Sequence, residues 1–219
     1  SAGSSPQAKG LWDYSLHQMA ADQARFGKLD RVGNTAMTGL AYAYHFDAAL
    51  YAKYLRAYAE KRGAIRIEGK VNDVALDGET GFVTSVTMDN GVVIEGDLFV
   101  DCTGFSSLLL QKTLAVPFIS YANNLLNDAA VALPSAIDEK IPSQTLAAAM
   151  NCGWAWKIPL TNRYGNGYVY SSAFCSADQA EYELRAHLGL LDTDVPVRHL
   201  RMKIGRVEQH WAGNCLAVG

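Results

Sequence analysis

At Gly63 the spacing of apolar residues changes from that of a helix to that of β-strands. Before this glycine, Tyr51, Leu55 and Tyr58 form one stripe at helical spacing, and Asp47 is placed to cap the start of the helix. After it, apolar residues fall in short β-branched runs broken by Gly and Asp, namely Ile65, Ile67, Val71, Val74, Val83, Val86 and Met88. The change predicts a helix that ends at Gly63 and is followed by a β-meander.

Further elements are predicted on both sides of this change. Apolar residues recur at helical spacing between residues 11 and 26, which favours an amphipathic helix. Asn90 and Gly91 supply two positive-φ residues for a tight turn, so the strand through Met88 should fold back on the one that begins at Val92. Residues 98–100 form an apolar strand that runs into a glycine turn at residues 101–104, and a short helix is expected around residues 108–110.

The second half of the chain is predicted to be mostly strands. They are expected at residues 129–133, 146–152, 154–160, 167–172, 200–204 and 215–218. One helix interrupts them, because Ser176 and Gln179 form a capping box at its start. Ala180, Leu184 and Leu188 should face inward from this helix, and Gly189 should end it.

Composition narrows the class of protein. A chain of 219 residues, 49% of them hydrophobic, can bury a full core. The 19 Lys+Arg residues are balanced by 22 Asp+Glu residues without a basic run, so a nucleic acid is not an expected partner. With neither a long apolar run nor the apolar core of a signal peptide, no membrane partner is expected and the cytoplasm is the expected compartment. The four separated cysteines, Cys102, Cys152, Cys175 and Cys215, lack metal-site spacing, so no metal is predicted and four buried reduced thiols are expected.

Residues 153–159 read GWAWKIP, with two tryptophans two positions apart. Alternate residues of a strand face the same side, so Trp154 and Trp156 should form a flat apolar wall, both largely buried. Lys157 should point the other way, and Pro159 should end or edge the strand. Spacing alone leaves an ordinary aromatic core strand as an equal alternative.

Two other segments place polar groups where chemistry could occur. Residues 42–48 read YAYHFDA, in which His45 is interpreted as a structural histidine and Asp47 as a helix cap. Residues 97–105 read DLFVDCTGF, and the glycine after Thr103 would let the backbone approach a ligand without a Cβ clash. A plain strand-to-helix turn is the alternative for this segment.

These three segments resemble the WxWxIP, YAxHFDA and DLFxDCTGF blocks of flavin-dependent halogenases of the tryptophan-halogenase type. Residues 167–172 and 214–219 resemble later blocks of the same enzymes, so the resemblance covers nearly the whole chain from Trp12. The family usually has an arginine after the phenylalanine of the DLFxDCTGF block, where this chain has Ser106. Any role of that arginine therefore does not carry over.

The resemblance implies an α/β (α+β) fold of the FAD-binding, glutathione-reductase type. The fold is similar to that of p-hydroxybenzoate hydroxylase and is incomplete here, with a mixed β-sheet and flanking helices. Residues 1–115 would hold a helix pair and the meander of the FAD-binding domain, residues 116–199 the mixed-sheet substrate side with the WxWxIP strand, and residues 200–219 a return to the FAD-binding domain. The apolar run directly before the last residue favours an interior piece of a longer protein.

The implied cofactor is FAD, reduced by a separate flavin reductase. Five positions are expected to bind it: Val71, Asp101, Thr103, Gly104 and Gly219. Val71 should lie close to the Thr103–Gly104 turn, because both belong to the FAD side of the sheet. The motif residues near the flavin would be Trp154, Trp156, Ile158 and Pro159.

No catalytic residue is assigned in this chain. The resemblance implies that the family's catalytic lysine and glutamate lie outside it, and Lys112 and Lys157 are not equivalents of that lysine. The GxGxxG turn that holds the FAD pyrophosphate in such enzymes is absent, and residues 165–170 lack its third glycine and its helix. The chain by itself is therefore expected to be inactive.

The activity implied for the whole protein is chlorination or bromination of an electron-rich aromatic compound. The resembling enzymes use reduced FAD, oxygen and chloride or bromide, and the tryptophan motif separates the substrate from the flavin. The substrate class is open between tryptophan, other indoles, phenols and pyrroles, and a homodimer is compatible with the resemblance. The alternatives are an FAD-dependent aromatic monooxygenase of the same fold, which the WxWxIP block disfavours, and a non-catalytic piece.

Overall fold

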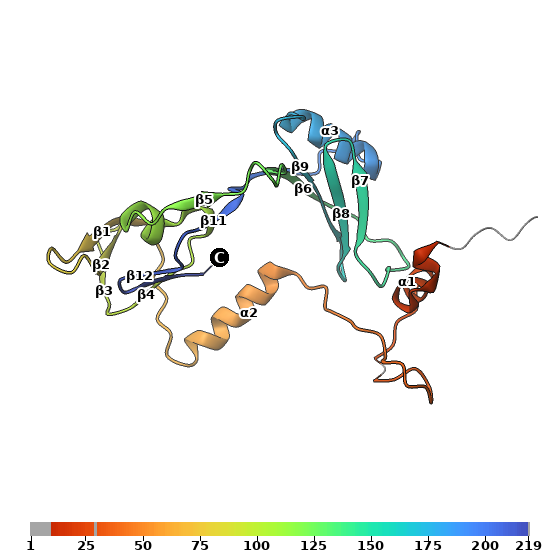
Figure 1. Ribbon diagram of the computed structural model, residues 1–219, viewed down its shortest axis with the longest axis horizontal. Helices are drawn as coiled ribbons and strands as arrows, with labels where there is room; N and C mark the ends of the chain where they lie inside the picture. The colour runs from red at the N-terminus through yellow and green to blue at the C-terminus, as the bar shows by residue number, and fades with distance from the viewer. Residues whose placement is uncertain (1–9, 29, 219) are drawn as a thin grey trace, which may run out of the picture. The chain divides into compact units, whose positions relative to one another are not determined.

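The computed structural model describes residues 10–28 and 30–218 (Figure 1). Gly219, expected to bind the cofactor, lies outside the described residues. The chain forms two compact units. The first contains the described residues up to Tyr51, together with Val131–Val169 and Ser176–His199. The second contains Ala52–Ala130, Tyr170–Cys175 and the described residues from Leu200 onward.

A five-stranded sheet with the strand order β10-β6-β9-β8-β7 dominates the first unit. Its strands are β6 (Ala129–Ser135), β7 (Leu146–Met150), β8 (Gly153–Pro159), β9 (Tyr164–Tyr170) and β10 (Arg198–Arg201). Helix α3 (Ala177–Leu188) packs on one face, where Ala180 and Leu184 are buried and the Glu183 carboxylate accepts a hydrogen bond from the Tyr168 hydroxyl. Tyr164, Asn166, Tyr168 and Tyr170 fill the core on this face.

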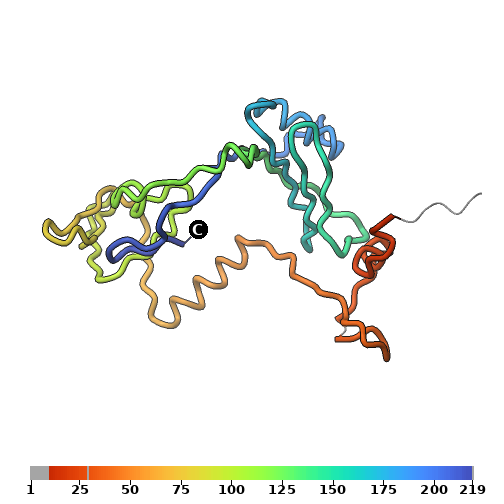
Figure 2. Tube along the Cα trace, in the orientation of Figure 1, coloured from red at the N-terminus to blue at the C-terminus, as the bar shows by residue number. Residues whose placement is uncertain are grey.

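The second unit is built from three smaller sheets. A meander joins β1 (Val71–Leu76), β2 (Val83–Met88) and β3 (Val93–Glu95). Strand β13 (Cys215–Ala217) lies between β12 (Trp211–Ala212) and β4 (Phe99–Asp101), and β5 (Phe118–Ser120) pairs with β11 (Gly205–Val207). The tube in Figure 2 shows the C-terminal segment running beside β4, with which β13 pairs in parallel.

The remaining helices are short, except for α2. They are the 3-10 helix η1 (Leu11–Tyr14), α1 (Leu16–Asp22), α2 (Ala48–Glu60), the 3-10 helix η2 (Gly104–Ser106) and the π-helix η3 (Leu108–Thr113). Within the described residues, no helix is both long and apolar enough to cross a bilayer.

The predicted helices α2 and α3, the meander and most of the predicted strands are confirmed. Asp47 Oδ1 caps α2 by accepting the backbone N–H groups of Ala49 and Leu50. Ser176 Oγ caps α3 by accepting the N–H of Gln179, and Gly189 ends that helix at φ 69°.

Four expectations need correction. The helix expected over residues 11–26 ends at Asp22, because the chain turns at Ala24, which has φ 50°. The Asn90–Gly91 hairpin forms, but only Gly91 has positive φ, since Asn90 uses its side-chain oxygen to accept the N–H of Val92 instead. The strand expected at residues 200–204 is placed at 198–201, where it pairs at the sheet edge. Burial is confirmed for Cys175 and Cys215 but not for Cys102, which is exposed, or for Cys152, which is half-buried.

Candidate functional site

The parallel strands β4 and β13 end at the same edge of their sheet. Ala217 lies opposite Asp101 in the register, and the N–H of Val218 donates to the Asp101 carbonyl at 2.9 Å. Ligands of open α/β sheets bind outside the carboxyl ends of parallel strands, because the loops that follow these ends diverge and leave a crevice. This edge is therefore a candidate ligand site.

The Asp101 side chain organises the turn that follows β4. It is buried, and its Oδ1 accepts the N–H of Thr103 at 3.0 Å and the Thr103 hydroxyl at 2.6 Å. Its Oδ2 accepts the N–H groups of Leu109 and Leu110 at 2.9 and 3.0 Å, which caps the start of η3. Burial acts to raise the pKa of Asp101, but the hydrogen bonds from Thr103, Leu110 and Leu109 outweigh it and hold the pKa below its ordinary value.

The Thr103–Gly104 turn presents bare backbone. Gly104 has φ +58°, and a Cβ placed on it would meet no atom within 4 Å. The glycine therefore serves the backbone conformation and leaves open space beside the turn. The side-chain oxygen of Thr103 accepts the N–H of Leu108 at 2.8 Å, so the turn is held from both ends.

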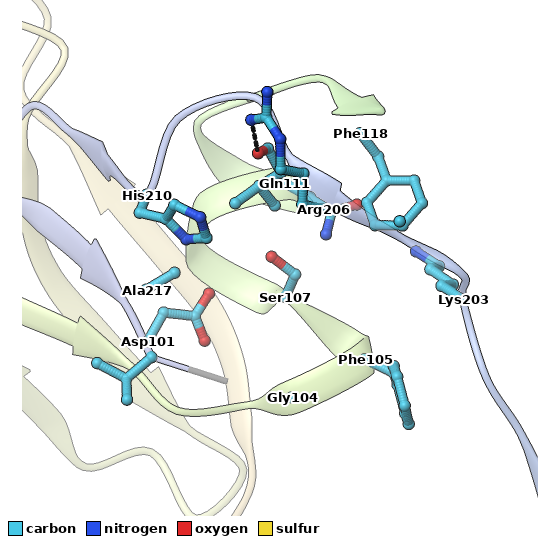
Figure 3. A pocket seen from close by; sticks show the side chains of 13 residues that line it. Asp101, Gly104, Phe105, Ser107, Gln111, Phe118, Lys203, Arg206, His210 and Ala217 are labelled. Carbon is cyan, nitrogen blue, oxygen red and sulfur yellow. Dashed lines mark hydrogen bonds between the residues drawn. The ribbon is translucent and has the colours of Figure 1, made fainter. Parts of the chain in front are cut away.

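A cavity of about 320 Å³ lies against this turn. Its wall includes five side chains that can donate hydrogen bonds, namely Ser107, Gln111, Lys203, Arg206 and His210. Figure 3 shows Asp101, Ser107 and His210 directed toward the hollow, while Phe105 points away from it. Donors and cations of this kind suit a ligand that carries hydroxyl and phosphate groups.

Val71 lies in the same unit as the turn. It packs against the core that contains Leu109 and Leu110, the two residues whose N–H groups bind Asp101. The meander is also tied to β13, since the Asn214 amide donates to the Val83 carbonyl at 2.8 Å and accepts the Val83 N–H at 2.9 Å. One hydrophobic core thus joins Val71 to the helix that follows the turn.

The two tryptophans of the GWAWKIP segment lie on strand β8, as expected. Their ring centroids are 6.0 Å apart, so they share one face of the strand. The expectation that both are largely buried is wrong: Trp154 is 44% exposed and Trp156 is half-buried. The buried side chains of β8 are Ala155 and Pro159 on the other face, the face that the helix α3 covers.

Lys157 lies on the face opposite the tryptophans, as expected. Its Nζ is 4.0 Å from the centre of the buried Tyr164 ring and 3.7 Å from Oδ2 of Asp138. Tyr164 donates its hydroxyl to the same Asp138 oxygen at 2.7 Å. Lys157 is therefore held in a polar cluster of the sheet.

Side chains of the YAYHFDA segment contact the loops of the five-stranded sheet. His45 Nε2 lies 3.0 Å from the Thr145 hydroxyl, and Asp47 Oδ2 accepts from Arg163 at 2.8 Å. The Arg163 hydrogen bond and the capped Leu50 N–H hold the pKa of Asp47 below its ordinary value. These contacts fix the segment to the loops at the ends of β7 and β8.

Sequence reasoning missed the donors on the cavity wall. Lys203, Arg206 and His210 come from residues 203–210, more than 90 positions after the turn. No motif spacing connects them to Asp101, and the pairings of β5 with β11 and of β4 with β13 bring them together. In the part of the chain that the structure describes, no group of three His, Cys, Asp or Glu side chains could hold a metal ion.

Comparison with known proteins defines the family. The model of the tryptophan halogenase family matches residues 2–219. The chain belongs to the tryptophan halogenase family. It is 46% identical over 185 residues to tryptophan 6-halogenase SttH of Streptomyces toxytricini, and 42% identical over 182 residues to tryptophan 7-halogenase RebH of Lentzea aerocolonigenes.

Solved structures agree with this assignment. BrvH, a flavin-dependent halogenase from Brevundimonas sp. BAL3, superposes over 97% of this chain with a TM-score of 0.88 at 40% identity. The α/β fold expected from the resemblance, with mixed sheets and few helices, is thereby confirmed. The match to SttH covers 83% of this chain and 35% of SttH, and the match to RebH covers 81% of this chain and 34% of RebH. The superposition on BrvH covers 44% of BrvH. It therefore spans about a third of the length of the curated relatives it matches.

Proposed function

We propose that this chain is part of a flavin-dependent halogenase, which uses reduced FAD, oxygen and chloride or bromide to halogenate an electron-rich aromatic compound. The observation that carries the proposal is the cavity at the ends of β4 and β13, in a chain of the tryptophan halogenase family. The relatives SttH and RebH are named tryptophan halogenases, which favours tryptophan or another indole as the substrate. An aromatic monooxygenase of the same fold is disfavoured, because the similar structures are halogenases.

The polar lining of the cavity suits the hydroxyl and phosphate groups of FAD. The turn at Thr103–Gly104 offers bare backbone, and Ser107, Gln111 and Lys203 offer donors to hydroxyl and phosphate oxygens. Arg206 also lines the cavity, with its Nη1 donating to the carbonyls of Val207 and Glu208. FAD would supply the oxidising chemistry when reduced and exposed to oxygen, and the protein would supply binding and orientation. Asp101 would act through the turn, because its carboxylate is occupied by Thr103 and the start of η3.

Val71 and Gly219 complete the proposed cofactor positions. Val71 would approach the adenine side with its strand backbone, and Gly219 would begin the turn over the flavin. On the first unit, Trp154, Trp156, Ile158 and Pro159 would lie near the flavin and keep substrate from it. The proposed layout assigns residues 1–115 and 200–219 to the FAD-binding domain and residues 116–199 to the substrate side.

The proposed partners follow from the same chemistry. A separate flavin reductase would deliver reduced FAD by diffusion, and the aromatic substrate would be a small molecule. We propose a cytoplasmic location, where reduced flavin is produced, and a homodimer as the oligomeric state to be tested by light scattering.

The test is a product assay on the full-length protein with flavin reductase, FAD, NADH and halide. Mass spectrometry and NMR should detect a single halogenated regioisomer of tryptophan or another indole. Replacement of Gly104 by Val should weaken FAD binding, because a β-branched side chain disfavours φ +58° and fills the space beside the turn. The matched control is Gly189→Val, which has φ +69° and open space but lies in the other unit and outside the residues assigned to the FAD-binding domain. A hydroxylated product would refute the halogenase proposal and favour the monooxygenase.

A further inference from the structure

Strands β8 and β9 are neighbours in the five-stranded sheet, and their two faces differ in what they carry. On the face under α3, Ala155 of β8 and Tyr168 of β9 are buried. On the opposite face, Trp154 and Trp156 stand on β8, and β9 has the alternate positions Gly165 and Gly167. The tryptophan face therefore meets glycines on the adjoining strand.

The Trp156 indole occupies the space where Gly167 would carry a side chain. A Cβ built on Gly167 falls onto three atoms of that ring, closer than real Cβ atoms ever approach. The backbone of Gly167 does not lie in the left-handed region, so its conformation would accept any residue. The glycine is required here by the ring and not by the backbone.

Gly165 provides a natural comparison on the same strand. A Cβ at this position would meet only Nη1 of Arg163 at 3.7 Å, an ordinary van der Waals contact. Its backbone is likewise outside the left-handed region. The two glycines therefore share a strand and a face and differ in whether an indole lies over them.

The position of Trp156 also sets the geometry of the tryptophan pair. The planes of the two rings are inclined by 55° at a centroid separation of 6.0 Å. Trp154 is 44% exposed and Trp156 is partly buried, so Trp156 is the ring that fixes the pair. A side chain at Gly167 would force this ring to turn away from β9.

We propose that Gly167 is a positioning residue, whose missing side chain seats the Trp156 indole against β9 and so sets the orientation of the Trp154–Trp156 wall. The consequence for catalysis rests on the proposed function, in which this wall separates substrate from flavin. Loss of the seat would lower the amount of halogenated product formed per reduced flavin consumed, while FAD binding in the other unit would be unchanged.

The test compares Gly167→Ala with Gly165→Ala in the full-length protein. The exciton couplet of the two indoles in the circular dichroism spectrum reports their mutual orientation, and Trp154→Phe identifies the part of the signal that belongs to the pair. We expect Gly167→Ala to abolish the couplet and lower the Tm, and Gly165→Ala to leave both near the wild-type values. Product formed per reduced flavin should fall several-fold in Gly167→Ala alone.

A double variant separates seating from general damage to the strand. In a Trp156→Leu background the large ring is gone, so adding Gly167→Ala should cost little further Tm. If Gly167→Ala fails to fold and Trp156→Leu does not rescue it, or if the couplet is unchanged, the proposal is wrong. If the couplet is lost but no variant or wild type halogenates, the positioning role stands and the proposed halogenase function fails.

Discussion

The Asp128 carboxylate holds Ser172 by two hydrogen bonds, one from its backbone N–H at 2.8 Å and one from its hydroxyl at 2.6 Å. Arg201 approaches the same carboxylate at 3.6 Å, and the Asp128 carbonyl accepts the N–H of Met202 at 2.9 Å. Asp128 therefore joins three segments that are far apart in the chain. The Ser172 hydroxyl is the main reason that the pKa of Asp128 lies below its ordinary value.

Replacing Asp128 by Asn should destabilise the second unit. The amide keeps one acceptor but places an NH₂ group against a donor of Ser172, and a modest loss of about 1 kcal/mol is expected because the carboxylate is partly exposed. Urea unfolding measures it. Ser172→Ala removes the hydroxyl partner of the same hydrogen bond and should destabilise the second unit as well. The control is Asp138→Asn, which changes a carboxylate in the first unit. If Asp128→Asn and Asp138→Asn lowered the stability of the second unit equally, the role assigned to Asp128 would be contradicted.

The Asp101→Asn change should have a larger effect. The side chain is 4% exposed and both of its oxygens accept two hydrogen bonds, so the amide leaves buried N–H groups without an acceptor. The expected loss is about 1 to 3 kcal/mol of unfolding free energy. Asp97→Asn, an exposed change in the same segment, should have little effect in the same urea titration. FAD affinity should fall with Asp101→Asn even under conditions where the variant is folded.

Asp101 should also make stability depend on pH at the acidic end. Its folded pKa lies below the ordinary value of 3.8, so folding favours the charged form. Its contribution is fully present above that value and is lost as the pH falls through the lower folded pKa. Unfolding free energy measured between neutral pH and strongly acidic pH should decline less steeply in Asp101→Asn than in the wild type; identical slopes would show that another carboxylate dominates.

Asn214→Ala should loosen the meander from β13. The Asn214 amide satisfies both the N–H and the carbonyl of Val83, a residue that is 1% exposed. Removing it leaves two backbone groups without their partner, at a cost of about 1 to 3 kcal/mol. Hydrogen exchange should show faster exchange at Val83 and along β2, whereas Asn90→Ala in the exposed hairpin should leave β2 protected.

The 219-residue chain alone should not give a regioselective halogenated product, even with reductase, FAD, NADH and halide. It contains no GxGxxG sequence for the pyrophosphate, and under the proposed function the family's lysine is expected to lie outside it. The measurement is mass spectrometry and NMR of the products, with the full-length protein as the positive control. A single regioisomer from the short chain would show that the catalytic groups have been misplaced.

Local chemistry explains which parts of the fold can be predicted from the sequence. Capping side chains such as Asp47 and Ser176 act within a few residues, so the predicted starts of α2 and α3 are correct. The shared face of Trp154 and Trp156 follows from strand alternation alone. Their burial does not, because it depends on which face of the sheet α3 covers, and alternation treats both faces alike.

Only one side of the candidate site can be predicted from the sequence, because the other side depends on contacts between distant segments. The Asp101–Gly104 turn is a contiguous segment, so its residues can be selected from the amino-acid sequence alone. The opposite wall, with Lys203, Arg206 and His210, depends on the pairings of β5 with β11 and of β4 with β13. The second of these pairings joins residues more than a hundred positions apart, which no local pattern reports.

The pairing of β4 with β13 has a consequence for how the protein is made. Asp101 leaves the ribosome long before Ala217, its partner in the register, so the crevice cannot be assembled while the intervening chain is still being synthesised. Closing so long a loop is slow, because the chain loses conformational entropy before the stabilising contacts between the two strands are formed. During that interval the edge of β4 is uncovered and open to pairing with other chains, which makes the late arrival of β13 the step at which chaperones would matter most.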